Sequence, residues 1–383
     1  MKTTLALTIC FFTWSAVPLR GFDYSIVVDP NVVVTGIRSD SLDQGISSVV
    51  ITASYNGGGG NTVAAVYKGS LAGATSPSAV WNQLIPVFSG QSVTSSTLYG
   101  PNTAVFTPSL GAGNIIAVGS YKYTESVAGA AADHGLLYQG TVTGSGTWTQ
   151  IDATPLVTGT DSLINTIAHS TMGNLVVGNY DTQLKTGNAF IYNRMSNTWS
   201  DLNPAGSLST TAYGIWQNGG SSSTSFTIAG GFSDLNSLGI DEGYLVNYDS
   251  STGLPSNYKT YNFDDLPLSS LQSHFDGITA TADGFHLTGY SITIDPAAES
   301  GFMASVRVLP DGSFSDATWT NITIPGAPVT TGNTVIGDYV LGFAPTGTSN
   351  SYVATIPEPS TWGLLGLGAA MAAIIRQRRL ITA

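Results

Sequence analysis

The alternation of hydrophobic and polar residues repeats six times along the chain. Each repeat is marked by a short apolar run that ends in a small residue and an aromatic residue. The six aromatic residues are Tyr55, Tyr121, Tyr180, Phe232, Tyr290 and Phe343, at intervals of 66, 59, 52, 58 and 53 residues. A repeat of this length, made of runs too short for helices, indicates a series of similar β-rich units.

Each unit supplies four candidate strands. A turn rich in Gly or Asn follows the marker, and then comes a second apolar run such as GLLYQG or AFIYN. A third run carries a tryptophan in four units, as in TWTQI and TWSDL, while the fourth unit has Tyr261 at that place. A further strand precedes the marker, as in INTIAHS and DGITATA. Four short strands in a unit of about 50–60 residues match the blade of a β-propeller.

The six units predict an all-β fold, a β-propeller of six blades over residues 22–356. A single unit cannot bury both faces of its sheet, so neighbouring units must pack together, and a closed ring leaves fewer exposed strand edges. The sixth unit ends at Ile356 without its outer strand. We expect FDYSIVV, residues 22–28, to supply that strand and close the ring. A β-sandwich or a solenoid with the same number of strands is the alternative.

The composition supports many short strands joined by tight turns. Charged residues are only 9% of the chain, there are 45 glycines, and hydrophobic residues make up 42%. Glycine and asparagine provide the positive φ angles of turns, and valine and threonine fit a pleated surface. The single cysteine, Cys10, lies in the apolar N-terminal segment. The rest of the chain therefore has no disulfide, no thiolate nucleophile and no cysteine metal site.

Residues 1–21 are predicted to form a short helical signal peptide. They contain one early lysine, Lys2, followed by an apolar run from Leu5 to Val17. Such a run has the length of a signal-peptide core and is short for a bilayer span. An uncleaved anchor is the alternative. A lipoprotein signal at Cys10 is disfavoured, because Ile9 stands where a small residue is needed.

The C-terminal segment, residues 357–383, has three parts. They are the triplet Pro357, Glu358 and Pro359, an apolar run from Trp362 to Ile375, and the arginines Arg376, Arg378 and Arg379. The apolar run is long enough for a helix of about 20 Å. The arginines would stay in the cytoplasm and stop translocation.

This arrangement closely resembles the PEP-CTERM sorting domain of Gram-negative bacteria. The resemblance implies a C-terminal transmembrane or sorting helix that anchors the chain transiently in the inner membrane. It also implies recognition by an exosortase-type membrane protease, cleavage near residues 357–359, and release or transfer to the cell surface. In that family the substrates are associated with exopolysaccharide and the biofilm matrix. A simple C-terminal anchor helix is the alternative.

Residues 133–181 resemble extracellular proteins with HAF repeats. Those repeats carry a His-Ala/Gly-Phe turn, a Leu-Tyr strand, a Thr-Ile-Asp element and a Gly-Asn/Gln-Ile-Val-Gly strand. The corresponding residues are His134-Gly135-Leu136, Leu137-Tyr138, Gln150-Ile151-Asp152 and Gly173 to Gly178. Leu136 replaces the phenylalanine, and one unit alone retains the histidine. The resemblance supports a repeat architecture and implies no catalytic residues.

The charge of the chain disfavours one class of partner. Residues 22–356 contain seven basic and 23 acidic residues, so their net charge is near −16. Such a surface repels phosphate backbones, which makes nucleic acid a poor partner. It is compatible with loose binding of divalent cations and with solubility outside the cell.

The sequence contains no recognisable catalytic signature. It has no Ser nucleophile elbow, no HExxH, no Walker or dinucleotide glycine pattern and no CxxC. The histidines His134, His169, His274 and His286 lack the spacing of metal ligands, and a structural role is expected for the first two. Paired carboxylates such as Asp264–Asp265 suit glycosidic acid–base chemistry, but nothing in the sequence selects one pair.

One acidic segment, FSDLNSLGIDEG, suggests a calcium loop. Asp234, Asn236 and Asp241 are its candidate ligands, because hard oxygen atoms at alternate positions can surround one cation. Leu238 occupies the third ligand place, and Glu242 comes too early for the bidentate position. A solvated turn is the alternative, and no other cofactor is expected.

Together these features predict an exported surface or matrix protein without catalytic activity, which binds polysaccharide on the faces of the ring. Tyr99, Trp216 and Tyr258 are candidates for stacking on sugar rings, although most aromatic residues are expected between the blades. The first alternative is a secreted propeller glycosidase or polysaccharide lyase, which needs acids or histidines that converge at the channel mouth. The second is a purely structural or adhesive surface protein.

Overall fold

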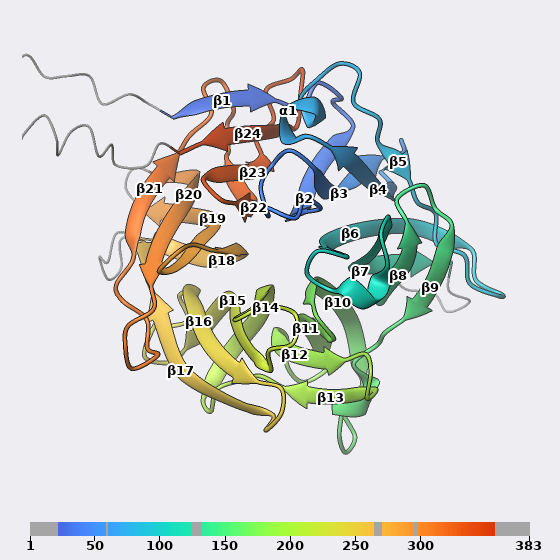
Figure 1. Cartoon of the computed structure of the whole chain (residues 1–383). Helices are drawn as coiled ribbons and strands as arrows, with labels where there is room; N and C mark the ends of the chain where they lie inside the picture. The colour runs from blue at the N-terminus through green and yellow to red at the C-terminus, as the bar shows by residue number, and fades with distance from the viewer. Residues whose placement is uncertain (1–21, 59, 125–131, 264–269, 295–296, 357–383) are drawn as a thin grey trace, which may run out of the picture.

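The computed structural model describes residues 22–58, 60–124, 132–263, 270–294 and 297–356, which form six four-stranded antiparallel sheets around a central channel (Figure 1). We number these sheets blades 1–6 in chain order. The predicted all-β propeller with six blades is confirmed, and the sandwich and solenoid alternatives are excluded. The segments 1–21 and 357–383, predicted as signal peptide and sorting helix, lie outside the described residues, as does the pair Asp264–Asp265.

Blades 1–5 are each built from four consecutive strands. From the channel outward, blade 1 contains β2 (Val32–Ser39), β3 (Val49–Asn56), β4 (Thr62–Gly69) and β5 (Asn82–Gln83), and blade 2 contains β6 (Val93–Thr103), β7 (Asn114–Tyr123), β8 (His134–Thr141) and β9 (Gly146–Gln150). Blade 3 contains β10 (Leu163–Met172), β11 (Leu175–Thr182), β12 (Asn188–Asn193) and β13 (Thr198–Asp201), and blade 4 contains β14 (Ser207–Gln217), β15 (Ser225–Asp234), β16 (Glu242–Asp249) and β17 (Leu254–Tyr261). Blade 5 contains β18 (Ser270–Ala280), β19 (Gly284–Ile294), β20 (Ala297–Arg307) and β21 (Thr318–Ile322). Short helical turns lie at α1 (Leu71–Ala74), Pro108–Leu110 and Thr154–Leu156.

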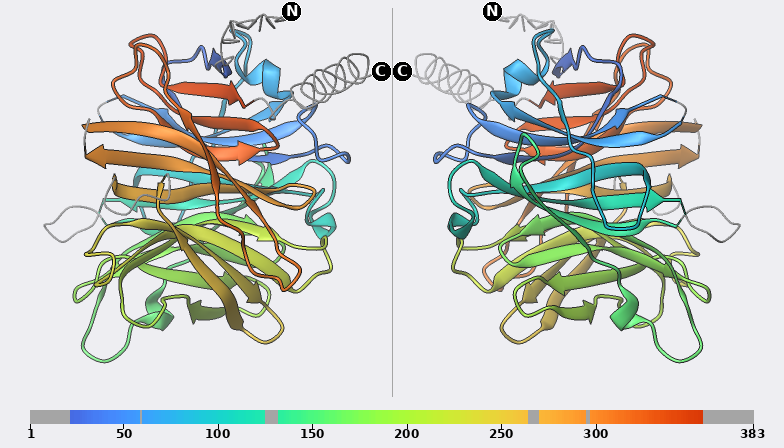
Figure 2. Two further views of the ribbon diagram at one scale, coloured as in Figure 1. Left: turned by 90° about the vertical axis from the view of Figure 1, so that its left-hand side faces the viewer. Right: turned by 90° about the vertical axis from the view of Figure 1, so that its right-hand side faces the viewer.

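Blade 6 combines the two ends of the chain. It contains β22 (Thr331–Ile336), β23 (Tyr339–Phe343), β24 (Ser351–Thr355) and, as its outermost strand, β1 (Asp23–Ile26). The pairing of β1 with β24 runs from Asp23 opposite Thr355 to Ile26 opposite Tyr352, and Figure 2 shows the two strands side by side. The predicted ring closure by the N-terminal strand is therefore confirmed.

Hydrophobic cores fill the space between neighbouring blades. Between blades 1 and 2, for example, Val50 and Val66 pack with Leu98, Ile115 and Tyr138, and all five side chains are fully buried. Successive side chains of a strand point to opposite faces of its sheet, so each blade contributes to the core on either side of it. Each copy of the apolar runs in the sequence therefore corresponds to one blade and to the hydrophobic cores that this blade shares with its neighbours.

The tryptophan runs form the outer strands that the pattern predicts. Trp148 of β9 packs on Tyr138 with ring centroids 4.5 Å apart, and Trp199 of β13 packs on Tyr192 at the same distance. Trp319 of β21 lies edge-on to Phe302 at 4.9 Å. These aromatic pairs attach each outer strand to the third strand of its blade, where cross-strand contacts stabilise a sheet.

Every innermost strand contains a β-bulge at the same position. At this position the strand pairing skips one residue in each of β2, β6, β10, β14, β18 and β22, and the skipped residues are Thr35, Tyr99, His169, Tyr213, Asp276 and Asn333. Four of these strands, β6, β10, β14 and β18, also skip a residue near their start. A bulge leaves its extra residue outside the ladder and redirects its side chain. The fold therefore places six unpaired residues in a ring around the channel, which we call the bulge ring.

A small residue follows each bulge because the next blade lies close to it. At Gly36, an added Cβ would meet the backbone oxygen of Tyr99 in β6. Gly36→Ala should therefore destabilise the protein by about 1–3 kcal/mol, the usual range for overpacking. The matched control is Gly57→Ala, where the Cβ makes an ordinary contact 3.4 Å from Val63. Urea unfolding of both variants tests this prediction, and equal midpoints would contradict it.

Candidate functional site

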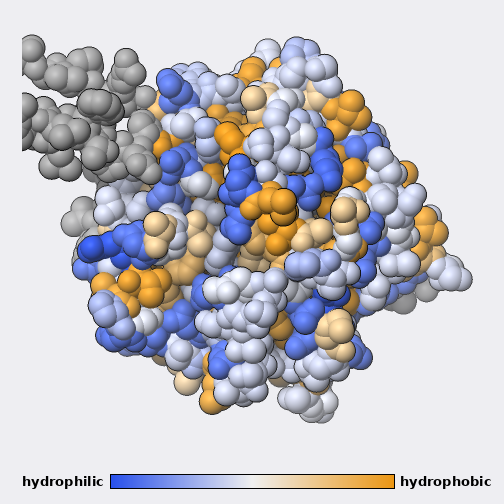
Figure 3. Space-filling model, viewed as in Figure 1, coloured by the Kyte–Doolittle hydropathy of each residue, from blue (hydrophilic) through white to orange (hydrophobic). Residues whose placement is uncertain are grey.

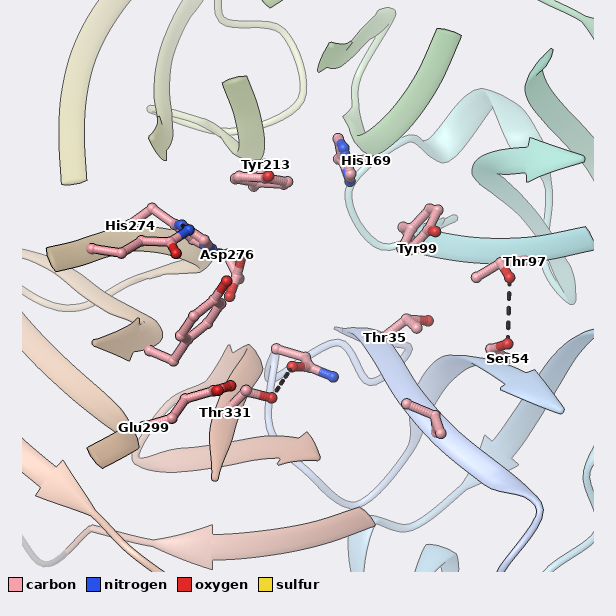
Figure 4. A pocket seen from close by; sticks show the side chains of 14 residues that line it. Thr35, Ser54, Thr97, Tyr99, His169, Tyr213, His274, Asp276, Glu299 and Thr331 are labelled. Atoms are coloured by element: carbon pink, nitrogen blue, oxygen red, sulfur yellow. Dashed lines mark hydrogen bonds and ion pairs between the residues drawn. The ribbon is translucent and has the colours of Figure 1, made fainter. Parts of the chain in front are cut away.

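One end of the central channel holds a cavity of about 530 Å³. Its walls are residues of the six innermost strands together with Ser54 of β3, Tyr290 of β19 and Glu299 of β20. The lining residues are Val33, Thr35, Ser54, Thr97, Tyr99, His169, Tyr213, Gln272, His274, Asp276, Tyr290, Glu299, Thr331 and Asn333. All six residues of the bulge ring belong to this set, and Figure 4 shows the labelled side chains around a common opening.

The side chain of Arg38 crosses the channel beneath this cavity. It extends from β2 of blade 1, and its Nη2 donates a hydrogen bond to the backbone oxygen of Ile215 in blade 4 at 3.0 Å. The guanidinium also lies 5.5 Å from the ring centroid of Trp216, a cation–π contact. Burial lowers the pKa of Arg38 to about 10, so the group remains charged at neutral pH.

Arg38 separates the cavity from the other end of the channel. It borders a small void of about 20 Å³ under the bulge ring and a second pocket of about 120 Å³ at the opposite end. In the view of Figure 1, side chains fill the centre of the ring, as Figure 3 shows. The cavity is thus a cup with one mouth.

A continuous arc of five rings lines one side of the cup. The ring of His169 lies 5.1 Å from that of Tyr99 and 4.4 Å from that of Tyr213. Tyr213 in turn stacks on His274 at 5.2 Å, and His274 lies edge-on to Tyr290 at 4.6 Å. We call these residues of blades 2–5 the aromatic arc.

The opposite wall is made of small polar side chains from blades 6 and 1. Thr331 donates a hydrogen bond from its hydroxyl to Oδ1 of Asn333 at 2.7 Å. The amide of Asn333 donates to the backbone oxygen of Val34 at 2.7 Å, and the hydroxyl of Thr35 donates to the backbone oxygen of Leu98. These bonds orient the hydroxyl and amide groups, so the cup combines ring surfaces on one side with hydrogen-bonding groups on the other.

His274 is held between two aspartates. Its Nδ1 lies 3.2 Å from Oδ2 of Asp241, and its Nε2 lies 3.1 Å from Oδ1 of Asp276. Burial by itself lowers the pKa of His274, but the charge of Asp276 and the hydrogen bonds to Asp241 and Asp276 outweigh it and raise the pKa to about 10. His274 is therefore an imidazolium at neutral pH, with a carboxylate at each ring nitrogen.

The second histidine of the cup is neutral. Burial and, to a smaller extent, the charge of His274 lower the pKa of His169, while the hydrogen bond to Asn179 raises it. The resulting pKa is about 4. Its Nε2 lies 2.6 Å from Oδ1 of Asn179, so in the neutral ring Nε2 carries the proton and Nδ1 is the acceptor.

Two carboxyl groups, Asp276 and Glu299, line the cup. Burial and the nearby charge of Asp241 raise the pKa of Asp276, against the attraction of His274. Burial raises the pKa of Tyr290 to about 12, with further contributions from the charges of Asp276 and Glu299. A carboxyl group with a raised pKa in the same cavity as a second carboxyl group has the components of acid–base chemistry at an acetal.

The structure separates the residues of the proposed calcium loop. Asp234 accepts hydrogen bonds from the backbone nitrogen of Ser237 at 2.8 Å and from the amide of Asn236 at 2.9 Å, within the turn after β15. Asp241 instead directs its carboxylate to His274. The part of the chain that the structure describes contains no group of three His, Cys, Asp or Glu side chains that could hold a metal ion. Calcium binding stays a prediction.

The histidines and aromatic residues singled out in the sequence divide between different places. His169 and His274 meet in the cup, whereas His134 pairs with Asp152 at 2.9 Å on the outer part of blade 2. His286 contacts the backbone oxygen of Gly337 at 2.9 Å. Among the aromatic candidates Tyr99 lines the cup, Trp216 lies beside Arg38, and Tyr258 stacks on Tyr244 in blade 4 at 5.0 Å.

Asp276 and Glu299 were not selected from the sequence, and nothing pointed to the convergence of His169 with His274. A signal was present in the alignment of the first strands, where each bulge residue stands between an apolar or small residue and Gly, Ser or Thr. The pairs are Thr35-Gly36, Tyr99-Gly100, His169-Ser170, Tyr213-Gly214, Asp276-Gly277 and Asn333-Thr334.

A family model for the PEP-CTERM protein-sorting motif matches residues 355–379. This match confirms the sorting segment and covers Pro357, Glu358 and Pro359 and the arginines Arg376, Arg378 and Arg379, whose individual roles in cleavage and stop-transfer stay predictions. The motif marks exported proteins that an exosortase processes, after transient anchoring at the C-terminus and before release to the cell surface. None of the helices in the described residues is long and apolar enough to cross a membrane.

No curated protein matches the chain. Among solved structures it is similar to a complex of BT0996 with RGII, with 10% identity, a TM-score of 0.42, and coverage of 88% of this chain and 92% of that protein. It is also similar to the GH43 protein BlXynB from Bacillus licheniformis, with 8% identity, a TM-score of 0.38, and coverage of 79% and 60%. At such values the activities of those proteins do not transfer to this chain. What the comparisons establish is a sorting motif on an exported protein.

Proposed function

We propose that this protein binds carbohydrate in the cup, as a non-catalytic protein of the cell surface or extracellular matrix. The observation that carries the proposal is the aromatic arc opposite a wall of oriented hydroxyl and amide groups. A sugar ring has an apolar C–H face, which packs on aromatic rings, and hydroxyl groups, which need donors and acceptors. A cavity of this size with ring surfaces and a few convergent polar groups is typical of small-ligand sites.

Export supports the same proposal. An exosortase releases its substrates outside the inner membrane, where a cup of this kind can meet secreted polysaccharide. The cup has one mouth because Arg38 crosses the channel below it. The proposed ligand is therefore the end or a side branch of an exopolysaccharide chain, rather than a chain threaded through the ring.

The proposal is tested by removing one ring of the arc. Tyr213→Ala should weaken binding of the producing cell's exopolymer about 5–10-fold, the effect of about 1 kcal/mol of lost ring contact. Binding is measured by affinity electrophoresis and on a glycan array. Tyr24→Ala, at a half-exposed tyrosine of the outermost strand of blade 6, is the control. Failure of the native protein to bind any glycan, or equal loss in both variants, would contradict the proposal.

A second candidate function is hydrolysis of a glycosidic bond in the cup. It is favoured by one observation, the raised pKa of Asp276 in the same cavity as Glu299. In that case Asp276 would protonate the leaving oxygen while Glu299 acted as base or nucleophile. Release of reducing ends from the exopolymer by the native protein, but not by Asp276→Asn or Glu299→Gln, would establish this function over the non-catalytic one.

A further inference from the structure

We propose that the cup selects sugars that carry a free amine, such as hexosamine units without an N-acetyl group, over neutral and acidic sugars. The inference rests on the proposed carbohydrate binding and adds the chemical class of the ligand. Its basis is the balance of charge at the mouth of the cup.

The charged groups of the cup are predominantly acidic. Asp276 and Glu299 line it, and Asp241 lies directly behind His274. Among the lining residues that the structure describes there is no lysine and no arginine. Three carboxyl groups face a single imidazolium, so acidic groups outnumber cations, and one added cation is favoured over an added carboxylate.

The imidazolium does not neutralise Glu299. His274 is engaged at both nitrogens, with Asp241 at one and Asp276 at the other. Glu299 makes no ion pair with any residue that the structure describes, although it borders the cup and is partly exposed. Arg38, the cation below the floor, donates to the backbone oxygens of Ile37 and Ile215 and borders the void beneath the cup. Glu299 is thus the carboxylate that is available to a ligand.

The aromatic arc adds a second source of attraction for an amine. An ammonium group over the face of a tyrosine is attracted by the ring quadrupole, by about 0.5–2 kcal/mol. Tyr99, Tyr213 and Tyr290 border the same cavity as Glu299. The rings that would pack against the sugar therefore also favour its positive charge, whereas an N-acetyl group would remove that charge.

The test compares three tetrasaccharides by isothermal titration at low ionic strength, in a slightly acidic buffer in which the sugar amines are protonated. These are the glucosamine tetramer, its fully N-acetylated form, and cellotetraose. We expect the glucosamine tetramer to bind at least tenfold more tightly than the other two. Glu299→Gln should reduce this preference about tenfold, because the change removes the carboxylate that distinguishes the amine from the neutral sugar. Glu242→Gln is the matched control, because Glu242 lies outside the cup and bonds to Asn262 through an oxygen that glutamine retains.

The outcomes separate this inference from the proposed function. If all three tetramers bind equally and Tyr213→Ala weakens all of them, amine selection is wrong and carbohydrate binding stands. If no tetramer and no exopolymer binds, the proposed function fails as well. Equal losses in Glu299→Gln and Glu242→Gln would show that the general acidity of the surface attracts the amine, which overturns the site. Spermidine that binds as tightly as the tetramer would overturn the requirement for a sugar.

Discussion

A chain without residues 22–28 should lose on the order of 5 kcal/mol of its free energy of unfolding, because the ring can no longer close. Removing β1 strips the outermost strand from blade 6 and leaves one edge of β24 without a partner strand. It also removes Val27, which is fully buried against blade 1 and donates a backbone hydrogen bond to Ser351 at 2.9 Å. Burial of one valine contributes about 1.5–3 kcal/mol and each hydrogen bond about 0.5–1.5 kcal/mol.

Such a loss approaches the whole stability of many domains, about 5–15 kcal/mol. Urea unfolding measures it, and the truncated chain should also aggregate through the open edge of β24. The control is a chain that ends at Ile356, which keeps all 24 strands and should unfold at the same urea concentration as the longer form. Replacing 22–28 by an unrelated polar heptapeptide should reproduce the deletion. Unchanged midpoints in both N-terminal variants would contradict the assigned role of β1.

The ring closure also constrains when the protein can fold. β1 and β24 are the first and last strands of the chain and pair with each other. Ring closure therefore requires that the last strand has left the translocation machinery. β24 ends at Thr355, and only Ile356 separates it from the sorting triplet. The strand that closes the ring and the expected cleavage site are therefore adjacent in sequence.

The architecture could be predicted because its determinants are local and repeated. Six copies of the same apolar runs identify the blades, and the missing outer strand after Ile356 identifies the ring closure at 22–28. Each prediction needs only the alternation of a strand and the rule that a sheet edge must be covered. The number of blades follows from the number of copies.

The cup could not be predicted in the same way, because its residues come from different blades. His169 and His274 belong to blades 3 and 5, and neither has a neighbour in sequence that suggests a site. Asp241 is an example of a residue whose neighbours in sequence suggest the wrong partner. Its spacing from Asp234 suggests a calcium loop, but the direction of its carboxylate is set by His274, a residue of the next blade.

His274 is the source of the second large effect, an alkaline loss of stability. Its pKa is raised from 6.5 to about 10 in the folded protein. A raised pKa means that the folded state holds the proton more tightly than the unfolded state does. The resulting stabilisation is complete below pH 6.5 and is lost as the pH rises through about 10. The pKa of His169 is lowered to about 4, so this residue changes the stability only below pH 6.5. Measurements above that pH therefore separate the effect of His274 from that of His169.

The variant His274→Gln should be less stable than the native protein at neutral pH, by on the order of 3 kcal/mol. The substitution leaves Asp241 and Asp276 without the cation between them, and breaking a buried ion pair from one side costs about 3–5 kcal/mol. Because Asp241 is partly exposed, water reduces its share of this cost. Thermal unfolding should show a native midpoint that falls between pH 7 and about 10, whereas the midpoint of the variant should change much less.

The same substitution at His286 is the matched control. That side chain lies in the same blade and outside the cup, where its Nδ1 is 2.9 Å from the backbone oxygen of Gly337 and 3.5 Å from Oδ1 of Asp338. His286→Gln should keep the alkaline fall of the native protein. Tyr290, whose burial raises its pKa to about 12, lowers the stability only near pH 10, where the phenol of the unfolded chain ionises, so the two variants are compared between pH 7 and about 9. Parallel pH curves for the native protein and His274→Gln would show that His274 is not charged in the fold. The carboxyl groups of the cup would then face no cation at all, which would strengthen the attraction for an amine while removing its alkaline signature.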